Sequence, residues 1–451
     1  MKVLLVYPTT TTNGTPDKFK KALIPPLNLA ILSRLTKLAD HKHQVTVINE
    51  YVQDIDFDSK WDLVGITALT SQVVRAYQIA DRFMQTGAKV VLGGVHPSLL
   101  TEEASQYANS IVVGEAENIW AEVLADAEAG RLKSIYQDSS FPDLKNLILP
   151  DWTGFDLSVY RRSIGNRMCR LPIYTTRGCL YGCSFCSVSK FFGRSYRCRP
   201  ISNVLNEINA VPAERYFFTD DNIVCRPSYS ADLFKALTTV GRKITWFGQS
   251  STTILKTPDL IPQAAKAGCT ALFFGVESIN SNNLTAVNKK FNDPIKYVEI
   301  ARRCYREGIK PWFSFIFGFD GESLDAMAET VFFLKKNQIW NVIFWILTPL
   351  PGTALWDEMK SAGRINNYDW SKYDLNHVVY IPDMTSADDL QDNFWKTFRA
   401  MYSIGTILPR AFYAQKISKR GFVNSLLNQY YFNQQIQNRN HPYSMGIWKT
   451  N

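Results

Sequence analysis

Three of the eight cysteines lie together in one short stretch that also contains two glycines. Cys179, Cys183 and Cys186 have the spacing C-x3-C-x2-C, which is typical of metal ligation. Three thiolates can hold three corners of a cubane iron-sulfur cluster, and the fourth iron is then open to a small molecule. The spacing therefore predicts a 4Fe-4S cluster with one corner free for a substrate or cofactor.

Two other uses of these cysteines fit the sequence less well. A zinc site normally takes a fourth cysteine or histidine nearby, but the nearest candidates, Cys169 and Cys198, lie outside any standard spacing. Disulfides are expected still less, because we predict neither a signal peptide nor a small cysteine-dense scaffold. The cluster remains the preferred interpretation.

The residues around these cysteines resemble the signature of the radical S-adenosylmethionine (SAM) superfamily. Phe185 precedes the last cysteine, and Arg177-Gly178 precedes the first. The resemblance implies that SAM chelates the open iron through its amino and carboxylate groups. It also implies that one electron from the cluster, supplied by a donor such as flavodoxin or ferredoxin, splits SAM into methionine and a 5'-deoxyadenosyl radical.

The composition is that of an ordered protein with a large core. The chain has 451 residues, 46% of them hydrophobic and 20% charged, which excludes a disordered protein and allows two or three domains. The longest apolar runs, such as residues 342–347, are too short to cross a bilayer, so no transmembrane segment is expected. We expect a cytoplasmic protein, because reduced cysteines and a reducible cluster persist there.

The net charge of +9 is concentrated near the C-terminus. Residues 391–451 contain eight Lys or Arg against one acid, Asp392, so this tail carries +7 and the rest of the chain +2. The tail is either a solvated helical face or a patch for an anionic lipid surface, a leader peptide or a nucleic acid. The solvated face is preferred because the charges are scattered, and no nucleic-acid partner is expected.

Strand and helix patterns alternate along the first 130 residues. Short apolar runs at 1–7, 44–49, 63–67, 89–92 and 111–113 predict buried parallel strands. Helical patterns cover 27–39, 71–85, 102–107 and 118–129. This alternation predicts a Rossmann-like, doubly wound α/β domain over residues 1–145.

Candidate ligand-binding residues follow the predicted strands, because ligands of such sheets lie beyond the carboxyl ends of the strands. Glycines allow close approach of the backbone, and hydroxyl groups bond to polar edges of a ligand. The candidates are Thr67, Thr70 and Ser71 after the third strand, Gly93, Gly94 and His96 after the fourth, and Gly114 and Glu115 after the fifth.

These strand ends are similar to the cobalamin-binding domain that precedes the catalytic barrel in one branch of radical SAM enzymes. The similarity spans most of residues 1–150 and implies that the eight candidates contact cobalamin. The D-x-H-x-x-G run that supplies an axial histidine in classical cobalamin proteins is absent. His96 either approaches the corrin or is a structural histidine, and we do not expect it to ligate cobalt.

A stretch without periodicity, with the basic pair Arg161-Arg162, predicts a linker over residues 146–170. Strand patterns at 171–176, 214–219, 244–248, 271–275, 310–317 and 341–347 then predict a partial (β/α)6 TIM barrel over residues 171–372. Amphipathic, aromatic patterns at 388–402, 407–413 and 424–431 predict a mostly helical C-terminal cap, residues 373–451, that shapes the substrate site.

Polar residues recur at the carboxyl ends of the predicted barrel strands, and these positions resemble the SAM-binding elements of the superfamily. Any one of them alone could be a capping or turn residue. The resemblance implies a SAM-binding set made of Phe185 near the cluster, Thr219, Asp220 and Asp221 at the amino group, Gln249 and Ser251 at the carboxylate, Glu277 at the ribose, and Phe317 and Pro349 beside adenine.

The remaining cysteines of the barrel have no spacing that suits a second cluster. Cys198, Cys225, Cys269 and Cys304 are interpreted as small buried hydrophobic residues. Either Cys198 or Cys225 could instead donate a hydrogen atom near the substrate, because they follow the cluster-binding and SAM-binding loops.

The sequence thus predicts a radical SAM enzyme that abstracts hydrogen from an unactivated carbon. With cobalamin bound, the expected reaction is C-methylation, in which methylcobalamin is regenerated from a second SAM. With an empty first domain, the substrate radical would cyclise, rearrange or epimerise instead. A non-catalytic iron-sulfur protein is the remote alternative. The substrate stays open between a lipid or tetrapyrrole, a peptide and an anionic small molecule.

Overall fold

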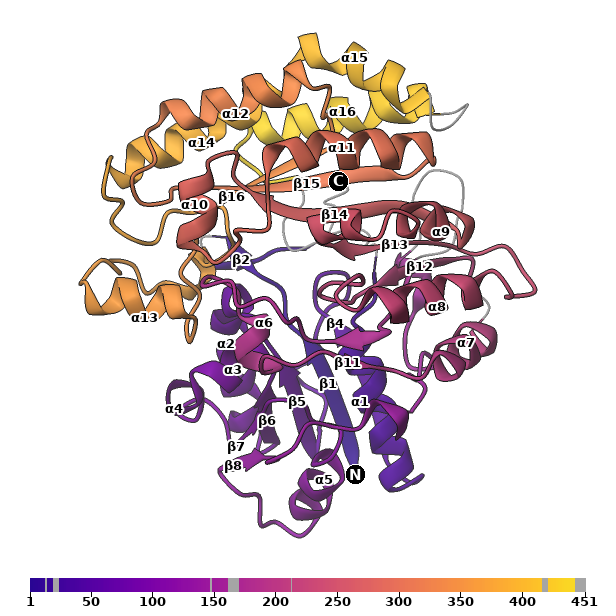
Figure 1. Ribbon diagram of the computed structural model, residues 1–451. Coiled ribbons are helices and arrows are strands. Elements are labelled where there is room, and N and C mark those ends of the chain that lie inside the picture. The colour runs from indigo at the N-terminus through magenta and orange to yellow at the C-terminus, as the bar shows by residue number, and fades with distance from the viewer. Residues whose placement is uncertain are drawn as a thin grey trace.

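The computed structural model describes residues 1–12, 14–18, 24–146, 148–160, 170–211, 213–415 and 421–442. Two parallel sheets and a C-terminal layer of helices follow one another along the chain, from the indigo N-terminal unit to the yellow cap (Figure 1). Several residues used in the sequence-based predictions lie outside the described part: Arg161, Arg162, Cys169, and four of the eight tail cations, Lys416, Lys419, Arg420 and Lys449.

The first sheet has six parallel strands in the order β4-β1-β5-β6-β7-β8. Its strands are β1 (Lys2–Tyr7), β4 (Gln44–Asn49), β5 (Leu63–Thr67), β6 (Lys89–Gly93), β7 (Ser110–Val113) and β8 (Ile135–Gln137). Its main helices are α1 (Leu27–Ala39), α2 (Val73–Gln85) and α5 (Trp120–Glu128). The predicted doubly wound α/β domain is confirmed.

The sequence did not predict β8 or the helix that follows β6. The region after β6 forms two short helices, α3 (Val95–Leu99) and α4 (Thr101–Ala104), where one helix over 102–107 was expected. Pro97 lies in the first turn of α3, a position in which a missing N–H costs no helical hydrogen bond. A prediction that treats proline as a helix breaker therefore misses α3.

The second sheet has six parallel strands in the order β16-β15-β14-β13-β12-β9, so β9 and β16 form its two edges and the barrel is partial, as predicted. Its strands are β9 (Leu171–Ile173), β12 (Arg215–Phe218), β13 (Thr245–Ser250), β14 (Cys269–Glu277), β15 (Lys310–Phe317) and β16 (Val342–Ile346). The helices around it are α7 (Ile201–Ala210), α8 (Pro227–Leu237), α9 (Leu260–Lys266), α10 (Ser281–Ala286), α11 (Pro294–Arg306), α12 (Asp325–Lys336) and α13 (Ala354–Ser361).

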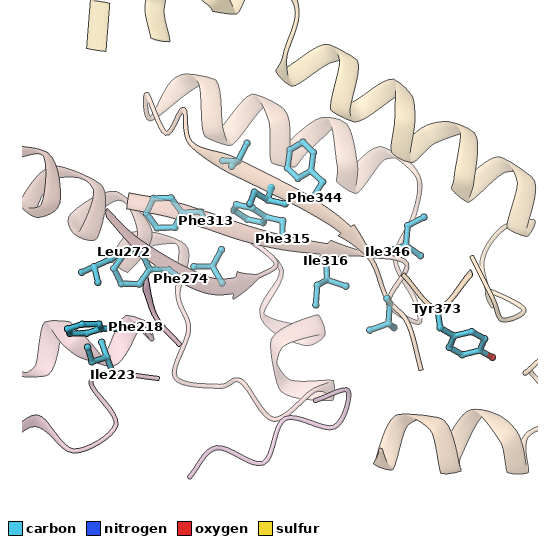
Figure 2. Packing of buried hydrophobic residues seen from close by; sticks show 14 of the residues in the cluster. Phe218, Ile223, Leu272, Phe274, Phe313, Phe315, Ile316, Phe344, Ile346 and Tyr373 are labelled. Atoms are coloured by element: carbon cyan, nitrogen blue, oxygen red, sulfur yellow. The ribbon is translucent and has the colours of Figure 1, made fainter. Parts of the chain in front are cut away.

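The barrel core is aromatic, and it lies between the sheet and its surrounding helices (Figure 2). Phe313 and Phe315 on β15 both approach Tyr297 of α11, with ring centroids 6.4 and 6.3 Å away. Phe344 on β16 lies 5.3 Å from Phe398 of the cap. Burying each such ring contributes about 1.5–3 kcal/mol to the stability of the folded protein. The strands that carry the site residues are therefore held by a well-packed core.

The cap consists of α14 (Ala387–Met401), α15 (Ile404–Gln415) and α16 (Gly421–Gln437). The predicted aromatic stripe of α14 is core, because Phe394, Trp395 and Phe398 are all buried. Among the described residues, no helix combines the length and apolarity that crossing a membrane requires.

Candidate cofactor site

The cysteine loop begins at the carboxyl end of β9 and is fixed by a small antiparallel ribbon. In this ribbon β10 (Thr176–Arg177) pairs with β11 (Arg197–Cys198). Gly178 follows with φ +88°, and a Cβ there would lie 2.3 Å from the Ser195 carbonyl oxygen. Only glycine fits this close approach, so Gly178 is a requirement of the loop geometry.

The three predicted cluster ligands lie on this loop as free thiols, with Cys183 buried and Cys179 and Cys186 partly buried. Burial raises the pKa of Cys183 to about 11 and that of Cys186 to about 12. Within the described ranges, no three Cys, His, Asp or Glu side chains are grouped closely enough to hold a metal ion. The donor set nevertheless fits an iron-sulfur cluster, because buried thiols with raised pKa values lose their protons when a metal compensates the charge.

Cys225 approaches this loop from the segment after β12. The contact between the two thiols lowers the pKa of Cys225, and the same contact, together with burial, raises the pKa of Cys179. Cys198 lies partly buried in β11, and the charge of its thiolate form raises the pKa of Cys225. The two candidate hydrogen donors are thus brought beside the predicted cluster, whereas Cys269 and Cys304 are buried as predicted.

The acidic residues after β12 support the cysteine loop. Asp220 is fully buried and accepts hydrogen bonds from the Thr175 hydroxyl at 2.6 Å and from Thr176. Asp221 accepts the Gly178 N–H at 3.1 Å, and burial raises its pKa to about 6. Asp221 therefore holds the backbone next to Cys179.

A chain of hydroxyl groups joins the end of β13 to the same loop. Ser251 and Thr253 share a hydrogen bond of 2.6 Å, and the Tyr181 hydroxyl donates to Thr253 at 3.1 Å. Tyr181 lies between Cys179 and Cys183 and was not among the predicted site residues. Gln249 lies within β13, where its carbonyl oxygen accepts the N–H of Ile223.

Glu277 closes β14 in a left-handed conformation, with φ +63°, which a non-glycine residue adopts at a cost of order 1–3 kcal/mol. Its carboxylate pairs with Lys289, which also donates to the Gly275 carbonyl at 3.2 Å. Burial opposes the charge of Lys289, but Glu277 outweighs it and the pKa of Lys289 is raised. Lys289 also lowers the pKa of Cys183, so this lysine is a site residue that sequence reasoning missed.

Three of the predicted SAM-binding residues are buried or hydrogen-bonded within the protein. Phe317 is buried in the aromatic core, 5.2 Å from Phe344. Thr219 donates its N–H to the Ile173 carbonyl at 2.8 Å and so joins β12 to β9. Pro349 is buried in the loop after β16. Phe185 lies partly buried on the cysteine loop, 5.7 Å from the Lys289 ammonium.

The predicted cobalamin contacts gather at the carboxyl ends of β5, β6 and β7. Gly94 has φ +93°, and a Cβ there would lie 2.7 Å from the Thr67 hydroxyl. Thr70 and Ser71 are buried in a short 3-10 helix, and Gly93 ends β6. Gly114 lines a cavity of about 340 Å³ that extends from Ser98 to Phe191, next to the cysteine loop.

His96 is completely buried, and its ring lies 5.3 Å from that of Trp370 in the segment after the barrel. Its Nε2 atom faces Glu103 at 3.4 Å, and Trp370 donates to the same carboxylate at 2.9 Å. These contacts favour the structural role considered for His96, through side-chain packing and a carboxylate.

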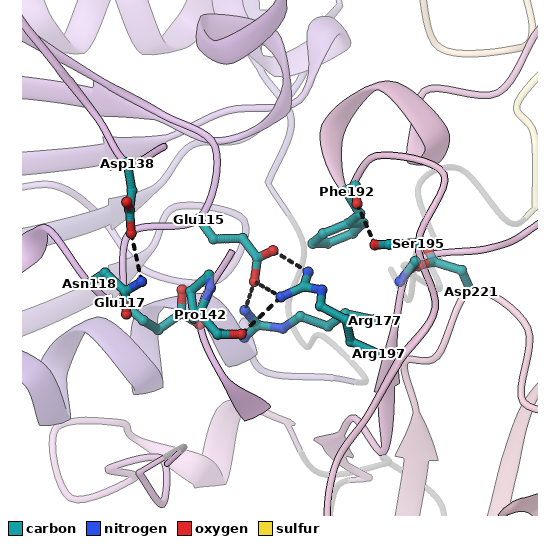
Figure 3. A network of polar contacts seen from close by, with 11 residues as sticks. Glu115, Glu117, Asn118, Asp138, Pro142, Arg177, Phe192, Ser195, Arg197 and Asp221 are labelled. Carbon is teal, nitrogen blue, oxygen red and sulfur yellow. Dashed lines mark hydrogen bonds and ion pairs between the residues drawn. The ribbon is translucent and has the colours of Figure 1, made fainter. Parts of the chain in front are cut away.

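Glu115 joins the first sheet to the cysteine loop. Its carboxylate accepts from both Arg177 and Arg197, and Arg177 also pairs with Glu117 at 2.5 Å (Figure 3). Arg197 further donates to the Pro142 carbonyl at 3.1 Å. Glu115 was expected to contact cobalamin, and no role was predicted for Arg197. This cluster, in which Glu115 and Arg177 are buried and Glu117 and Arg197 are partly buried, is called the junction below.

Family models match two parts of the chain. The model of the radical SAM superfamily matches residues 173–334, and that of the B12 binding domain matches residues 21–124. These matches confirm both resemblances, and with them the predicted fold and the predicted set of cofactors, a 4Fe-4S cluster, SAM and cobalamin.

Several curated proteins are similar over nearly the whole chain. Bacteriochlorophyllide d C-12(1)-methyltransferase of Chlorobaculum tepidum is 34% identical and covers 95% of this chain and 93% of its own. The C-8(2)-methyltransferase of the same organism is also 34% identical, covering 86% and 88%.

Two solved structures share the fold. OxsB with aqua-cobalamin bound has a TM-score of 0.70 at 16% identity, over 96% of this chain and 71% of that one. TsrM from Kitasatospora setae, with cobalamin and a 4Fe-4S cluster bound, has a TM-score of 0.65 at 16% identity, over 95% and 99%.

Proposed function

Because this chain belongs to the radical SAM superfamily, in the branch with an N-terminal B12 binding domain, we propose that it is a cobalamin-dependent C-methyltransferase. The junction is the observation that carries this proposal. It holds the strand ends of the B12 binding domain against the loop of the predicted cluster ligands. Methyl transfer to a substrate radical needs both cofactors to face one substrate.

The proposed substrate is a tetrapyrrole of the chlorophyllide type. The two relatives at 34% identity are named for methylation of bacteriochlorophyllide d. A more distant relative from Rubrivivax gelatinosus, 24% identical over 94% of this chain, is named as a magnesium-protoporphyrin IX monomethyl ester cyclase. All three relatives are thus named for tetrapyrroles, which are large, flat and mostly apolar molecules.

In this proposal Cys179, Cys183 and Cys186 hold the cluster. When bound, the cluster and SAM supply a 5'-deoxyadenosyl radical, and cobalamin supplies a methyl group. The protein groups around them orient the loop: Asp221 fixes the Gly178 N–H, and the Ser251–Thr253–Tyr181 hydroxyl chain fixes the opposite side. Glu277 and Lys289 place an ion pair beside Cys183.

The remaining predicted contacts are proposed with the roles that their surroundings support. For SAM we keep Phe185, Thr219, Asp221, Gln249, Ser251, Glu277 and Pro349. For cobalamin we keep Thr67, Thr70, Ser71, Gly93, Gly94 and Gly114. Four residues with buried partners of their own, Asp220, Phe317, His96 and Glu115, are proposed to support these sites. Cys198 and Cys225 remain candidate hydrogen donors.

The proposed setting of the enzyme is the cytoplasm, with flavodoxin or ferredoxin as the electron donor. The proposed units are residues 1–145 for cobalamin, 146–170 as linker, 171–372 for the cluster and SAM, and 373–451 for shaping the substrate site.

The test uses anaerobically purified protein with SAM, a reductant and a bacteriochlorophyllide d-type tetrapyrrole. We expect corrin absorption bands that persist through gel filtration, formation of 5'-deoxyadenosine, and a product heavier by one methylene unit in mass spectrometry. A protein that takes up no cobalamin, or a product that is cyclised without gaining a methyl group, would contradict the proposal.

A further inference from the structure

A segment that follows β16 contacts both the cysteine loop and the carboxyl end of the first sheet. It covers residues 352–372, through α13 and the 3-10 helix η5 (Trp370–Lys372), and we call it the strut. Figure 1 shows α13 at the level where the two sheets meet. One end of the strut lies on the cysteine loop, and the other lies beside the turns that follow β5 and β6.

The first end of the strut is bonded to the cysteine loop. The Leu355 N–H donates to the carbonyl oxygen of Ser184, which lies between the second and third cysteines, at 3.0 Å. Three residues earlier, Gly352 packs against Leu99 of α3, and a Cβ on this glycine would lie 3.3 Å from the leucine side chain. The strut therefore starts where the cysteine loop and the first domain both come close.

Aromatic rings connect the two ends of the strut. Trp356 on α13 and Trp370 in η5 are both buried, and their ring centroids lie 5.7 Å apart. Tyr373 packs edge-on against both rings, at 6.1 and 4.8 Å. Large rings in such dense packing have little room to move, so the position of η5 is set by the anchor of α13 on the cysteine loop.

At the last end of the strut, Trp370 binds a partly buried carboxylate of the first domain. Its indole N–H donates to Oε1 of Glu103 at 2.9 Å, and the Tyr77 hydroxyl donates to the same atom at 3.0 Å. Burial disfavours the charge of Glu103, but hydrogen bonds from His96, Tyr77 and Trp370 outweigh it and lower the pKa of Glu103. The carboxylate is thus a charged acceptor shared by three donors.

This carboxylate orients the His96 ring. Nε2 of His96 faces Oε1 of Glu103 at 3.4 Å, whereas Nδ1 is buried without a hydrogen-bond partner in the described part of the chain. The His96 ring also lies against that of Trp370, with centroids 5.3 Å apart. Hydrogen bonding therefore fixes this ring through Glu103 alone, and packing fixes it through Trp370.

The strut in this way holds two turns that are predicted to contact cobalamin. His96 ends the glycine turn after β6, and its backbone N–H donates to the Ala68 carbonyl at 3.2 Å, which ties this turn to the end of β5. The 3-10 helix of residues 70–72 packs against η5 itself. One turn is thus held through Glu103 and Trp370, and the other by direct contact with η5.

We propose that Trp370 is a positioning residue for cobalamin, carried by a strut that is anchored on the cysteine loop. This inference rests on the function proposed above, because it takes the first sheet to bind cobalamin. Without the indole N–H, Glu103 loses a charge-assisted hydrogen bond, and the His96 turn loses its tie to the strut. Loosened turns bind a large cofactor less tightly, because they must be ordered when it binds.

The test is equilibrium dialysis of the purified full-length protein against hydroxocobalamin. Trp370→Phe keeps an aromatic ring and removes the N–H donor, and we expect it to raise the Kd for hydroxocobalamin at least about fivefold. Glu103→Ala should have a similar effect, and the double variant should bind no more weakly than the single variants, because all three lose the same contact. Glu103→Gln keeps an acceptor oxygen for the indole N–H and should restore most of the affinity.

The matched control is Trp340→Phe, which changes another buried tryptophan, beside Arg410 of the cap. It should bind hydroxocobalamin like the wild type. Circular dichroism verifies that each variant is folded, and an unchanged iron content verifies that the cysteine loop is intact.

The outcomes separate this inference from the proposed function. If the wild type takes up no hydroxocobalamin, the proposed function fails and the inference fails with it. If the wild type binds hydroxocobalamin and Trp370→Phe and Glu103→Ala bind it as tightly, the inference alone is overturned. It is also overturned if Trp340→Phe weakens binding as much as Trp370→Phe, because a general loss of stability would then explain both.

Discussion

The carboxyl ends of the two parallel sheets carry different kinds of groups. Beyond the first sheet lie glycines, small hydroxyl residues and a cavity of about 340 Å³. Beyond the second lie thiols, the carboxylates of Asp220 and Asp221, and the Glu277–Lys289 pair. The first end offers shape and close backbone approach, which suits a large planar cofactor. The second end holds charge in a low-dielectric site, which suits electron transfer and a charged cofactor.

The largest expected effect removes the thiols of the second end. Cys179→Ala, Cys183→Ala or Cys186→Ala should abolish formation of 5'-deoxyadenosine, because each thiol is expected to hold one iron of the cluster. Iron content should fall while cobalamin absorption persists, since the first sheet is unchanged. Cys304→Ala, a buried cysteine elsewhere in the barrel, is the control. A triple Cys→Ala variant that still makes 5'-deoxyadenosine would refute the cluster assignment.

The junction is where the two ends meet, and removing its central charge should uncouple them. Glu115→Gln removes the carboxylate that Arg177 and Arg197 share. Breaking a fully buried ion pair costs about 3–5 kcal/mol. Because Arg177 keeps Glu117 and Arg197 is only partly buried, we expect a loss in the free energy of unfolding below that range, measured by denaturant titration. We also expect more 5'-deoxyadenosine per methylated product.

The matched control for the junction is Glu102→Gln, which changes an exposed glutamate on α4 of the same domain. It should leave unchanged both the free energy of unfolding and the amount of 5'-deoxyadenosine formed per methylated product. If Glu115→Gln behaves like Glu102→Gln, the junction does not couple the two sheets.

Acidity should affect the second end through Asp221. Burial raises its pKa to about 6, above the ordinary 3.8, so the native state binds this proton more tightly than the unfolded state. The stabilising effect of that proton is complete below about pH 4 and is lost as pH rises to about 6. Asp221→Asn keeps an acceptor for the Gly178 N–H and removes the titration.

The free energy of unfolding of the variant should therefore rise relative to that of the wild type as pH increases from about 4 to about 6. At neutral pH the difference should reach up to about 3 kcal/mol. Denaturant titrations of the protein as purified, across this range, measure the difference. Asp232→Asn, at an exposed position on α8, is the control: its free energy of unfolding should differ from that of the wild type by the same amount at every pH. A flat difference for Asp221→Asn would mean that its carboxylate is not destabilised by burial.

The elements of both sheets could be predicted because each leaves a local signal in the sequence. Buried parallel strands appear as short apolar runs, and the structure reproduces α1, β4, β5 and β15 at the predicted residues. The thiol loop was equally visible, because its chemistry depends on residues only three and four positions apart. Such signals survive without knowledge of the tertiary structure.

The partners of charged residues could not be predicted, because they are far apart in the chain. Glu115 and Arg177 are separated by 62 positions, and each had a plausible local role, one at a glycine turn and the other before a cysteine. Lys289 lies in a polar stretch after α10 with no pattern of its own, yet it neutralises Glu277. Cys225 likewise shows no spacing to Cys179, although the two thiols meet. Sequence spacing finds ligands on one loop and misses contacts made by folding.

The smallest expected effect concerns close packing at the first end, and it has an internal reference. Gly94 and Gly87 both have positive φ, +93° and +86°, so alanine at either position costs at least about 1 kcal/mol in backbone strain. At Gly87 a Cβ meets nothing within 4 Å, whereas at Gly94 it would lie 2.7 Å from the Thr67 hydroxyl and 2.9 Å from the Ala68 backbone. Gly94→Ala should therefore destabilise the protein by about 1–2 kcal/mol more than Gly87→Ala, in the range typical of overpacking. It should also weaken retention of cobalamin in gel filtration, whereas iron content stays the same. Equal losses for the two variants would mean that the space beside Gly94 is not needed, and the contrast between a first end built on shape and a second end built on charge would fail there.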